Sequence, residues 1–375
     1  MAVAKDPLLL TPGPLTTSAP TKQAMLHDWG SRDSAFIELT ARLRRRLSAL
    51  AEAEAEHVSV PLAGSGTFAV EAMLGTMVAR EGRALVLVNG AYGRRMAEIL
   101  TLAGRAYEIL EGAEDQPLDT VAAAARMDAD SRISDVVMVH CETTSGVLNP
   151  LEEIAEAVAR RTKRLLVDAM SSFGAIPIDA RRIAFDGLAA SANKCLEGVP
   201  GMGFVLARRA RLEACQGNCH SLGLDLHAQW QGFEKNGQWR FTPPTQVIAA
   251  LDGALDQLEA EGGIGGRFAR YWENCHILVS GMRRMGFETF LKDAVQAPII
   301  VTFRMPRHSG FDFTAFYDGL ARHGFLIYPG KLTGDASFRI GCIGDIRARD
   351  MENLLVAVES VLGELGIGAI AGQSG

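Results

Sequence analysis

Short apolar segments alternate with longer amphipathic segments through about the first 200 residues of the chain. Segments 84–88, 136–140 and 165–168 are short and largely apolar, which is typical of buried strands. Between such runs, segments including 36–54 and 68–78 have the apolar spacing expected of helices. Strands that alternate with helices predict a large three-layer α/β domain with a mainly parallel sheet.

The order of elements changes after the glycine-rich segment 262–266. The remaining pattern predicts a smaller α+β domain at the C-terminal end of the chain. Its expected elements are a helix at 267–285, a strand at 299–303, a helix at 313–323, a strand at 337–340 and a helix at 348–362.

These patterns divide the chain into four parts, and segment 208–240 within the second part is expected to be irregular. Residues 11–14 read Thr-Pro-Gly-Pro, which cannot be helical because proline lacks the N–H donor and fixes φ. The predicted parts are an N-terminal arm (1–15), the large α/β domain (16–262), the small α+β domain (263–366) and a disordered tail (367–375).

Composition and charge narrow the class of protein. The 375 residues are 48% hydrophobic and carry a formal net charge of −6, with basic residues scattered along the chain. We therefore expect no nucleic-acid partner, which would require a basic face. No signal peptide and no apolar run of the ~18 residues of a membrane span is evident, so we expect a cytoplasmic protein without a membrane partner.

The six cysteines are expected to be reduced thiols, since the chain has no secretory signal. Cys215, Cys219, His220 and His227 are close in sequence, but their spacing is not that of a usual zinc site. No metal is expected.

An acid and an amine follow two predicted strands. Asp168 ends the apolar run 165–168, and Lys194 follows the run 185–192. If these strands are parallel neighbours, both side chains emerge at the carboxyl edge of the sheet, where open α/β sheets bind ligands. Together they could hold pyridoxal 5′-phosphate (PLP), the acid pairing with the protonated pyridine nitrogen and the lysine forming the Schiff base. A helix N-cap and a solvated lysine are the alternative interpretation.

A glycine loop opens the predicted helix 68–78. Ser65, Gly66 and Thr67 would present free N–H groups and hydroxyls at a helix N-terminus, which suits a terminal phosphate. A simple capped turn is the structural alternative. The spacing of Gly64, Gly66 and Ala69 also resembles a dinucleotide fingerprint, but the next strand ends in Asn-Gly rather than an acid, so NAD is not favoured.

Three further side chains are candidates with open alternatives. Tyr92 lies in a predicted glycine-flanked turn and could stack on a pyridine ring or pack on a helix. Thr143 lies in a hydroxyl-rich loop and could bind a phenolic oxygen or cap a helix. Arg339 lies on an apolar strand of the small domain and requires an anion, either an internal carboxylate or a substrate.

Seven motifs occur in an order and spacing that resembles the class-V, fold-type-I PLP aminotransferases. They lie at Leu9–Pro14, Asp28–Asp33, Gly64–Thr67, Val167–Ser172, Ser191–Cys195, Gly237–Thr245 and Phe338–Gly341. The resemblance extends from Leu8 to about Leu365 and is strongest to the branch that transfers the amino group of 2-aminoethylphosphonate to pyruvate.

The resemblance implies a role for each candidate residue. Lys194 would bind PLP covalently and move the proton, and Asp168 would keep the ring nitrogen protonated. Tyr92 would stack on the ring, where more distant relatives usually carry Trp, and Arg339 would bind the substrate anion. The remaining implied cofactor contacts are Ser65, Gly66, Thr67, Thr143, Ser191 and Thr242.

Thr242 would reach the phosphate of the neighbouring subunit, which implies a homodimer with shared sites. Gln246 departs from the expected His, and Arg32 is a weaker candidate for the phosphonate.

The reaction implied is a step of phosphonate catabolism. 2-Aminoethylphosphonate would become phosphonoacetaldehyde, and pyruvate would become L-alanine. An alanine–glyoxylate or serine–glyoxylate transaminase would use the same residues. A PLP lyase of the cysteine desulfurase type would require a mobile cysteine, for which Cys342 is the candidate. A non-catalytic binding protein on the same fold would not need Lys194.

Overall fold

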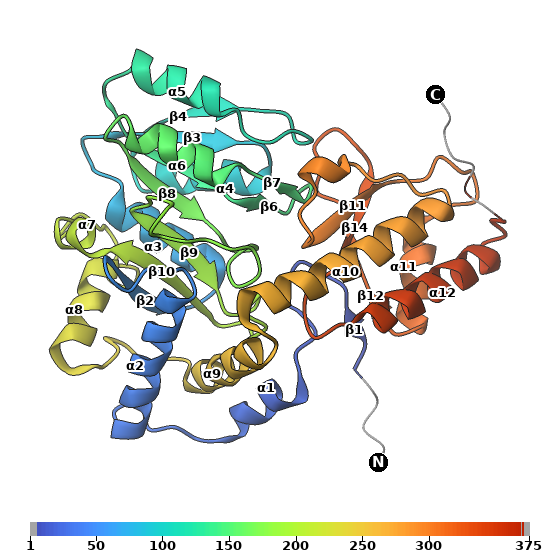
Figure 1. The fold of residues 1–375 in the computed structure, drawn as a ribbon, viewed down its shortest axis with the longest axis horizontal. Helices are drawn as coiled ribbons and strands as arrows, with labels where there is room; N and C mark the ends of the chain where they lie inside the picture. The colour runs from blue at the N-terminus through green and yellow to red at the C-terminus, as the bar shows by residue number, and fades with distance from the viewer. Residues whose placement is uncertain (1–5, 369, 371–375) are drawn as a thin grey trace.

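A seven-stranded sheet forms the centre of the larger domain in the computed structural model, which describes residues 6–368 and residue 370 (Figure 1). Its strand order is β2-β10-β9-β8-β5-β3-β4. The five strands from β9 to β4 run parallel, and β10 runs antiparallel to both of its neighbours. The strands are β2 (His57–Ala63), β3 (Arg83–Val88), β4 (Ala106–Glu111), β5 (Ile133–Val139), β8 (Arg164–Asp168), β9 (Gly187–Ser191) and β10 (Met202–Arg208).

Successive residues of each central strand enter different hydrophobic cores, because side chains alternate across a sheet. In β8, Leu165 and Val167 belong to one core and Leu166 to the other. The first core lies under α2 (Ser34–Ala49), α5 (Thr120–Ala129), α6 (Leu151–Ala159) and α9 (Thr245–Ala260), and the second under α3 (Gly66–Met77), α4 (Ala91–Leu102) and α8 (Leu226–Asn236). The predicted α/β architecture with a mainly parallel sheet is confirmed.

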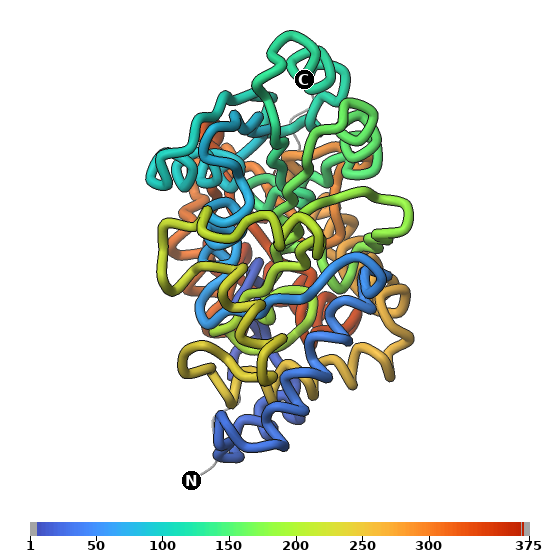
Figure 2. Tube along the Cα trace, turned by 90° about the vertical axis from the view of Figure 1, so that its left-hand side faces the viewer, coloured from blue at the N-terminus to red at the C-terminus, as the bar shows by residue number. Residues whose placement is uncertain are grey.

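The smaller domain packs three helices on an antiparallel sheet of order β11-β14-β13. A cluster of phenylalanines fills its core, with Phe303 and Phe338 stacked at 5.5 Å. Viewed from the large-domain side in Figure 2, the orange and red trace of the small domain lies behind the large one. Its elements are α10 (Gly263–Arg284), β11 (Ile300–Arg304), α11 (Phe313–Arg322), β12 (Phe325–Leu326), β13 (Tyr328–Pro329), β14 (Ser337–Gly341) and α12 (Ala348–Glu364).

The N-terminal segment joins this smaller domain. Strand β1 (Leu8–Leu9) pairs in parallel with β12, and Leu10 is buried in the phenylalanine core. The segment predicted as an arm is thus built into the small domain over part of its length. Helix α10 begins at Gly263, where the predicted small domain begins, and the division itself stays a prediction.

Two expectations about irregular segments were wrong. Segment 208–240 contains α7 (Arg209–Glu213) and α8, and α8 has an N-cap at Asp225 and a left-handed Gly237 at its end, which are ordinary helix signals. In the predicted disordered tail, Ile367 and Ile370 are 2% and 7% exposed and pack into the small-domain core. Residues 369 and 371–375 of that tail lie outside the described residues.

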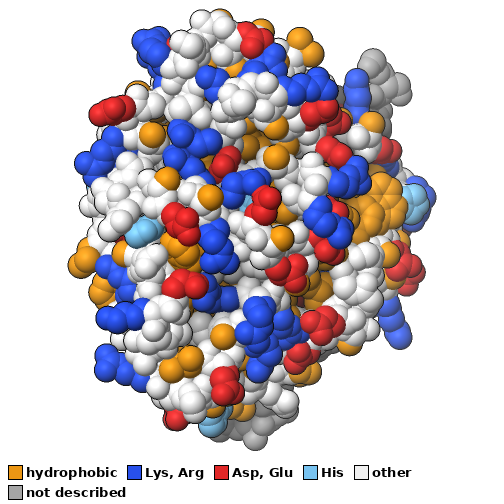
Figure 3. Space-filling view, turned by 60° about the vertical axis from the view of Figure 1, so that its left-hand side comes forward, with side chains coloured by type: hydrophobic (Ala, Val, Ile, Leu, Met, Phe, Trp, Pro, Cys, Tyr) orange, Lys and Arg blue, Asp and Glu red, His pale blue; other side chains and the backbone are white. Residues whose placement is uncertain are grey.

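Other features bear on the classes of protein considered above. Within residues 6–368 and residue 370, no helix has the length and apolarity to cross a membrane, and no three His, Cys, Asp or Glu side chains are grouped as metal ligands. All six cysteines are unpaired thiols. On the face shown in Figure 3, acidic and basic side chains are interspersed.

The phenylalanine core predicts a large effect of truncation at Phe316, which is fully buried and contacts Phe287, Phe311 and Phe338. Phe316→Ala should lower the free energy of unfolding by about 3–5 kcal/mol because it leaves a cavity. Val356→Ala, on the exposed face of α12, should change it by no more than ~0.5 kcal/mol. Urea unfolding of both variants measures this, and equal small effects would contradict the described packing.

Candidate active site

The structure brings Asp168 and Lys194 to the same edge of the sheet. Strands β8 and β9 are parallel neighbours, with Asp168 opposite Ala189 in the register. Asp168 is the last residue of β8, and Lys194 lies three residues beyond the end of β9. Because both strands end at this edge, the two side chains meet where an open α/β sheet binds its ligand.

Burial favours the neutral form of both groups and shifts the two pKa values in opposite directions. Burial raises the pKa of Asp168 to about 6, although its carboxylate accepts a hydrogen bond from the Met170 amide at 2.9 Å. Burial lowers the pKa of Lys194, whose Nζ donates to the carbonyl of Pro12. Within the described part of the chain the two side chains form no direct ion pair. A ligand with complementary charge would therefore be bound strongly between them.

The predicted phosphate site lies at the start of α3. Ser65 is the N-cap, but its hydroxyl makes no capping hydrogen bond, so it remains available. A Cβ at Gly66 would lie 2.3 Å from the Met170 sulfur, so any larger residue there would force the Met170 side chain to move. Arg95 of α4 donates to the Thr67 hydroxyl at 3.4 Å, which adds a cation beside the helix N-terminus. The combination suits an anion.

Tyr92 was predicted to lie in a glycine-flanked turn. In the structure it is the second residue of helix α4, which begins at Ala91. The Arg95 guanidinium lies 4.8 Å from the centre of its ring. Burial opposes ionisation of the Tyr92 phenol, but nearby cations, Lys194 foremost, lower its pKa overall. The aromatic ring is thus part of the same charged site as Lys194.

The N-terminus of α4 is capped from a distant loop. Gly90 has no side chain to serve as a cap, and instead Glu142 accepts from the amides of Tyr92 (3.1 Å) and Gly93 (3.3 Å). The Thr144 hydroxyl accepts from the Ala91 amide at 2.9 Å and donates to Glu142 at 2.6 Å. Glu142 is fully buried, and burial raises its pKa. These bonds fix Tyr92 relative to the loop that holds Thr143.

Arg339 reaches the site from β14 of the small domain. It is 2% exposed and donates to the carbonyls of Thr143 at 2.8 Å and Pro329 at 3.1 Å. Burial lowers the pKa of Arg339, and its described partners are neutral carbonyls, so its positive charge is not matched by a protein carboxylate. This is the environment of an anion receptor.

Two buried polar atoms near Asp168 have no hydrogen-bond partner within the described residues. They are Ser191 Oγ, at the end of β9, and His140 Nδ1, directly after β5. Burial lowers the pKa of His140 to about 4, so its imidazole is neutral. Unpaired buried polar atoms are costly, and a ligand that bonded them would offset that cost.

The structure does not place Thr242 with the other predicted residues. Thr242 is exposed, in the loop before α9, where it lines a surface pocket of about 340 Å³ together with Arg32. None of the other predicted site residues lines that pocket. Thr242 therefore faces outward from its own chain.

The N-terminal segment is a part of the site that the sequence did not indicate. Gly13 has φ +116°, and a Cβ there would lie 2.7 Å from the Lys194 amine. The Thr-Pro-Gly-Pro turn therefore covers Lys194 directly. Its prolines signalled a turn, but nothing in the pattern placed that turn beside a residue 182 positions away. Glu142 and Arg95 were missed for the same reason.

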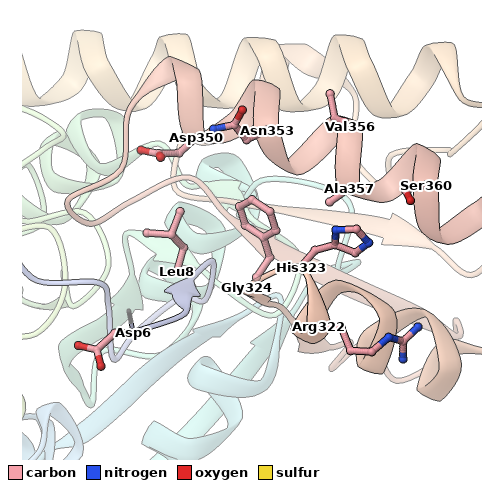
Figure 4. Close-up of a pocket in the computed structure, with 11 residues that line it drawn as sticks. Asp6, Leu8, Arg322, His323, Gly324, Asp350, Asn353, Val356, Ala357 and Ser360 are labelled. Carbon is pink, nitrogen blue, oxygen red and sulfur yellow. The ribbon is translucent and has the colours of Figure 1, made fainter. Parts of the chain in front are cut away.

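A separate surface pocket lies within the small domain, between β1, the end of α11 and α12 (Figure 4). None of the predicted site residues lines it. Its lining consists of Asp6, Leu8, Arg322, His323, Gly324, Phe325, Asp350, Asn353, Val356, Ala357 and Ser360.

Comparison with known proteins identifies the class. The profile of the family "Aminotransferase class-V" matches residues 29–328. The chain belongs to the class-V aminotransferase family. The 2-aminoethylphosphonate–pyruvate transaminase of Pseudomonas fluorescens is 54% identical over 97% of this chain and 99% of its own length. The transaminase of the same name from Pseudomonas aeruginosa is 54% identical, covering 96% of this chain and 97% of its own.

Solved structures confirm the predicted fold. Ureidoglycine–glyoxylate aminotransferase from Bacillus subtilis is similar with a TM-score of 0.89 and 24% identity, covering 100% of this chain and 97% of its own. Pyridoxamine–pyruvate aminotransferase from Mesorhizobium loti has a TM-score of 0.88 and 22% identity, covering 98% and 96% respectively.

The buried Asp168 carboxylate predicts a pH-dependent cost to the ligand-free fold. Because its pKa is higher in the folded protein (about 6) than its ordinary value of 3.8, the folded state binds the proton more tightly. Stability is therefore lost as pH rises between these two values, by about 3 kcal/mol at most.

Asp168→Asn keeps the shape without the charge, so the ligand-free variant should melt above the parent at pH 8, with a gap that shrinks toward pH 4.5. Thermal melts across this range measure the effect. Asp318→Asn, on the exposed face of α11, is the control. If the difference in melting temperature between Asp168→Asn and the parent does not change with pH, the pKa of Asp168 is not raised in the folded protein.

Proposed function

We propose that this chain is a PLP-dependent aminotransferase that moves the amino group of 2-aminoethylphosphonate to pyruvate, giving phosphonoacetaldehyde and L-alanine. The juxtaposition of a buried Asp168 and a half-buried Lys194 at one sheet edge carries the proposal. The substrate pair is inferred from the relatives that bear that name at 54% identity over nearly the whole chain. We also propose a cytoplasmic setting, where six cysteines would remain reduced.

The residues present fit PLP. The start of α3, with Ser65, Gly66 and Thr67, would hold its phosphate, and Asp168 would face its ring nitrogen. Ser191 Oγ, buried without a partner, has the donor and acceptor capacity that such a ligand would use. When bound, PLP supplies an aldehyde that takes up the amino group and a protonated ring that withdraws electrons from the substrate carbon.

Lys194 is suited to both of its proposed tasks, covalent attachment and proton movement. Because burial lowers its pKa, a neutral amine is more readily available than on a solvated lysine. Once displaced by the substrate amine, it would take the proton from the carbon that bears the amino group. A positioned base of this kind contributes roughly 10²–10⁴-fold to the rate.

Tyr92 and Thr143 would orient the ring, and Arg339 would hold the anionic end of the substrate. The ring of Tyr92 is fixed by the cap at the start of α4. Arg339 is held by two carbonyls, so it is oriented before the substrate binds. It would bind phosphonate in one half-reaction and the pyruvate carboxylate in the other.

One alternative is disfavoured by a specific observation. A cysteine desulfurase reaction requires an accessible, mobile thiol. Cys342 is instead fully buried in the small-domain core, where burial raises its pKa well above the ordinary value. A glyoxylate-dependent transaminase would use the same site residues. The two activities are distinguished by whether pyruvate or glyoxylate is the preferred amino acceptor.

The first prediction concerns the reaction itself. With 2-aminoethylphosphonate as donor, the PLP-loaded enzyme should consume pyruvate faster than glyoxylate, and phosphonoacetaldehyde should form in equal amount to L-alanine. Lys194→Ala should lower turnover at least ~10³-fold, because it removes both the covalent link and the base. Lys292→Ala, on the exposed surface, is the control. Faster turnover with glyoxylate would favour the alternative transaminase.

The second prediction concerns a shared site. We propose a homodimer in which Thr242, exposed on its own chain, completes the partner's phosphate site. Lys194→Ala and Thr242→Glu subunits should each be inactive alone. In a mixed dimer, the Lys194 of one chain meets the Thr242 of the other, so one intact site forms.

Random mixing would restore about a quarter of the parental activity, since about half of the dimers are mixed and each has one site. The measurement is activity after co-refolding or co-expression of the two variants. If each site is confined to one chain, no activity will return.

A further inference from the structure

A loop of the small domain crosses onto the large domain beside the candidate active site. This loop, residues 330–336, connects β13 to β14. Glu114 of the large domain accepts from the Thr333 amide at 3.0 Å and from its hydroxyl at 3.1 Å. Asp335 is paired with Arg304 of β11 at 2.7 Å. The loop is therefore anchored on both domains.

The loop carries a lysine that faces Tyr92. Lys331 Nζ lies 5.1 Å from the centre of the Tyr92 ring. Within the described residues, Lys331 forms no ion pair and donates no hydrogen bond. Lys331 is an exposed residue that places its positive charge over the Tyr92 ring, and no carboxylate among the described residues is paired with it.

Lys331 and Arg339 converge on the same place. Strands β13 and β14 pair with Tyr328 opposite Arg339, and Pro329, whose carbonyl orients Arg339, is two residues before Lys331. Both cations lower the pKa of the Tyr92 phenol. Adjacent parts of the small domain therefore bring two cations to the part of the site formed by Tyr92 and Thr143.

The charge of the two proposed substrates differs. A phosphonate, like a phosphate monoester, carries between one and two negative charges at neutral pH, whereas a carboxylate carries one. Arg339 alone matches a carboxylate. It has already committed two N–H groups to the Thr143 and Pro329 carbonyls, which leaves it fewer donors for three phosphonate oxygens. A second cation is what a dianion requires and a carboxylate does not.

We propose that Lys331 is a specificity-determining residue that binds the phosphonate together with Arg339 and so discriminates 2-aminoethylphosphonate from carboxylate substrates. This inference rests on the proposed function. Glu114 would serve as a positioning residue, because it anchors the loop that carries Lys331. The competing interpretation is that Lys331 is a solvated lysine that only covers the Tyr92 ring.

The test compares the two half-reactions in the PLP-loaded enzyme. The loss of cofactor absorbance is followed in single turnovers with 2-aminoethylphosphonate or with L-alanine as donor. Lys331→Gln should lower kcat/KM for 2-aminoethylphosphonate about 10- to 100-fold, mainly through KM, because a charge-assisted bond is lost. The value for L-alanine should change less than about 2-fold. Lys331→Arg should restore most of the loss.

Binding without turnover gives an independent measurement. Ethylphosphonate and propionate lack the amine and should act as competitive ligands of the loaded enzyme. Lys331→Gln should raise the dissociation constant of ethylphosphonate by a similar ~10- to 100-fold and leave that of propionate unchanged. Glu114→Ala should also weaken the binding of ethylphosphonate and not that of propionate, but by a smaller factor. Lys292→Gln, on the exposed surface, is the matched control and should change neither ligand.

The outcomes separate the two proposals. If the parent enzyme does not react with 2-aminoethylphosphonate, the proposed function is wrong and the role of Lys331 falls with it. If the parent reacts but Lys331→Gln affects both donors equally, or neither, only the role of Lys331 is overturned. A selective loss with the phosphonate that Lys331→Arg repairs would support the proposal.

Discussion

The candidate site depends on a buried acid, Asp168, and a half-buried amine, Lys194, that lie at one edge of the sheet and form no ion pair with each other within the described residues. Asp168 and Lys194 lie at one edge of the parallel sheet, and burial moves the pKa of each toward its neutral form. A pair of this kind is costly to the empty fold and is retained only where surrounding structure enforces it. The strand register enforces it here, because Asp168 ends β8 and Lys194 follows β9 directly. A ligand with a cationic ring nitrogen and an electrophilic carbonyl would relieve both costs together.

A second constraint connects the cofactor side of the site to the substrate side. Glu142 and Thr144 cap α4, which positions Tyr92, while the carbonyl of Thr143 between them accepts from Arg339. The loop is buried, so its geometry is set by hydrogen bonds that have no alternative partners in water. The Tyr92 ring and Arg339 therefore share one support, although they belong to different domains.

Local pattern was sufficient for the parts of the site that follow directly from strand topology. Parallel strands predict a common carboxyl edge, so Asp168 and Lys194 could be paired from the sequence, and a glycine turn before an apolar helix predicted the anion site at Gly66. Tyr92, Thr143 and Arg339 each had an equally good local interpretation, and only tertiary contacts resolve where they lie. The contact of Pro12 with Lys194 spans 182 positions and has no local signature. Ile367 and Ile370 were assigned to a disordered tail because chain ends are usually poorly ordered, but both side chains are buried in the small-domain core.

The two domains contribute different kinds of group to the site. The large domain provides the charges and amides that suit a cofactor, from β8, β9 and α3, whereas the small domain provides Arg339 and the loop that carries Lys331. The supporting elements have separate hydrophobic cores, since residues of β8 and β9 belong to one and residues of β14 to the other. Solved structures with 22–24% identity and names that give different substrates share this fold, so the fold alone does not decide the substrate.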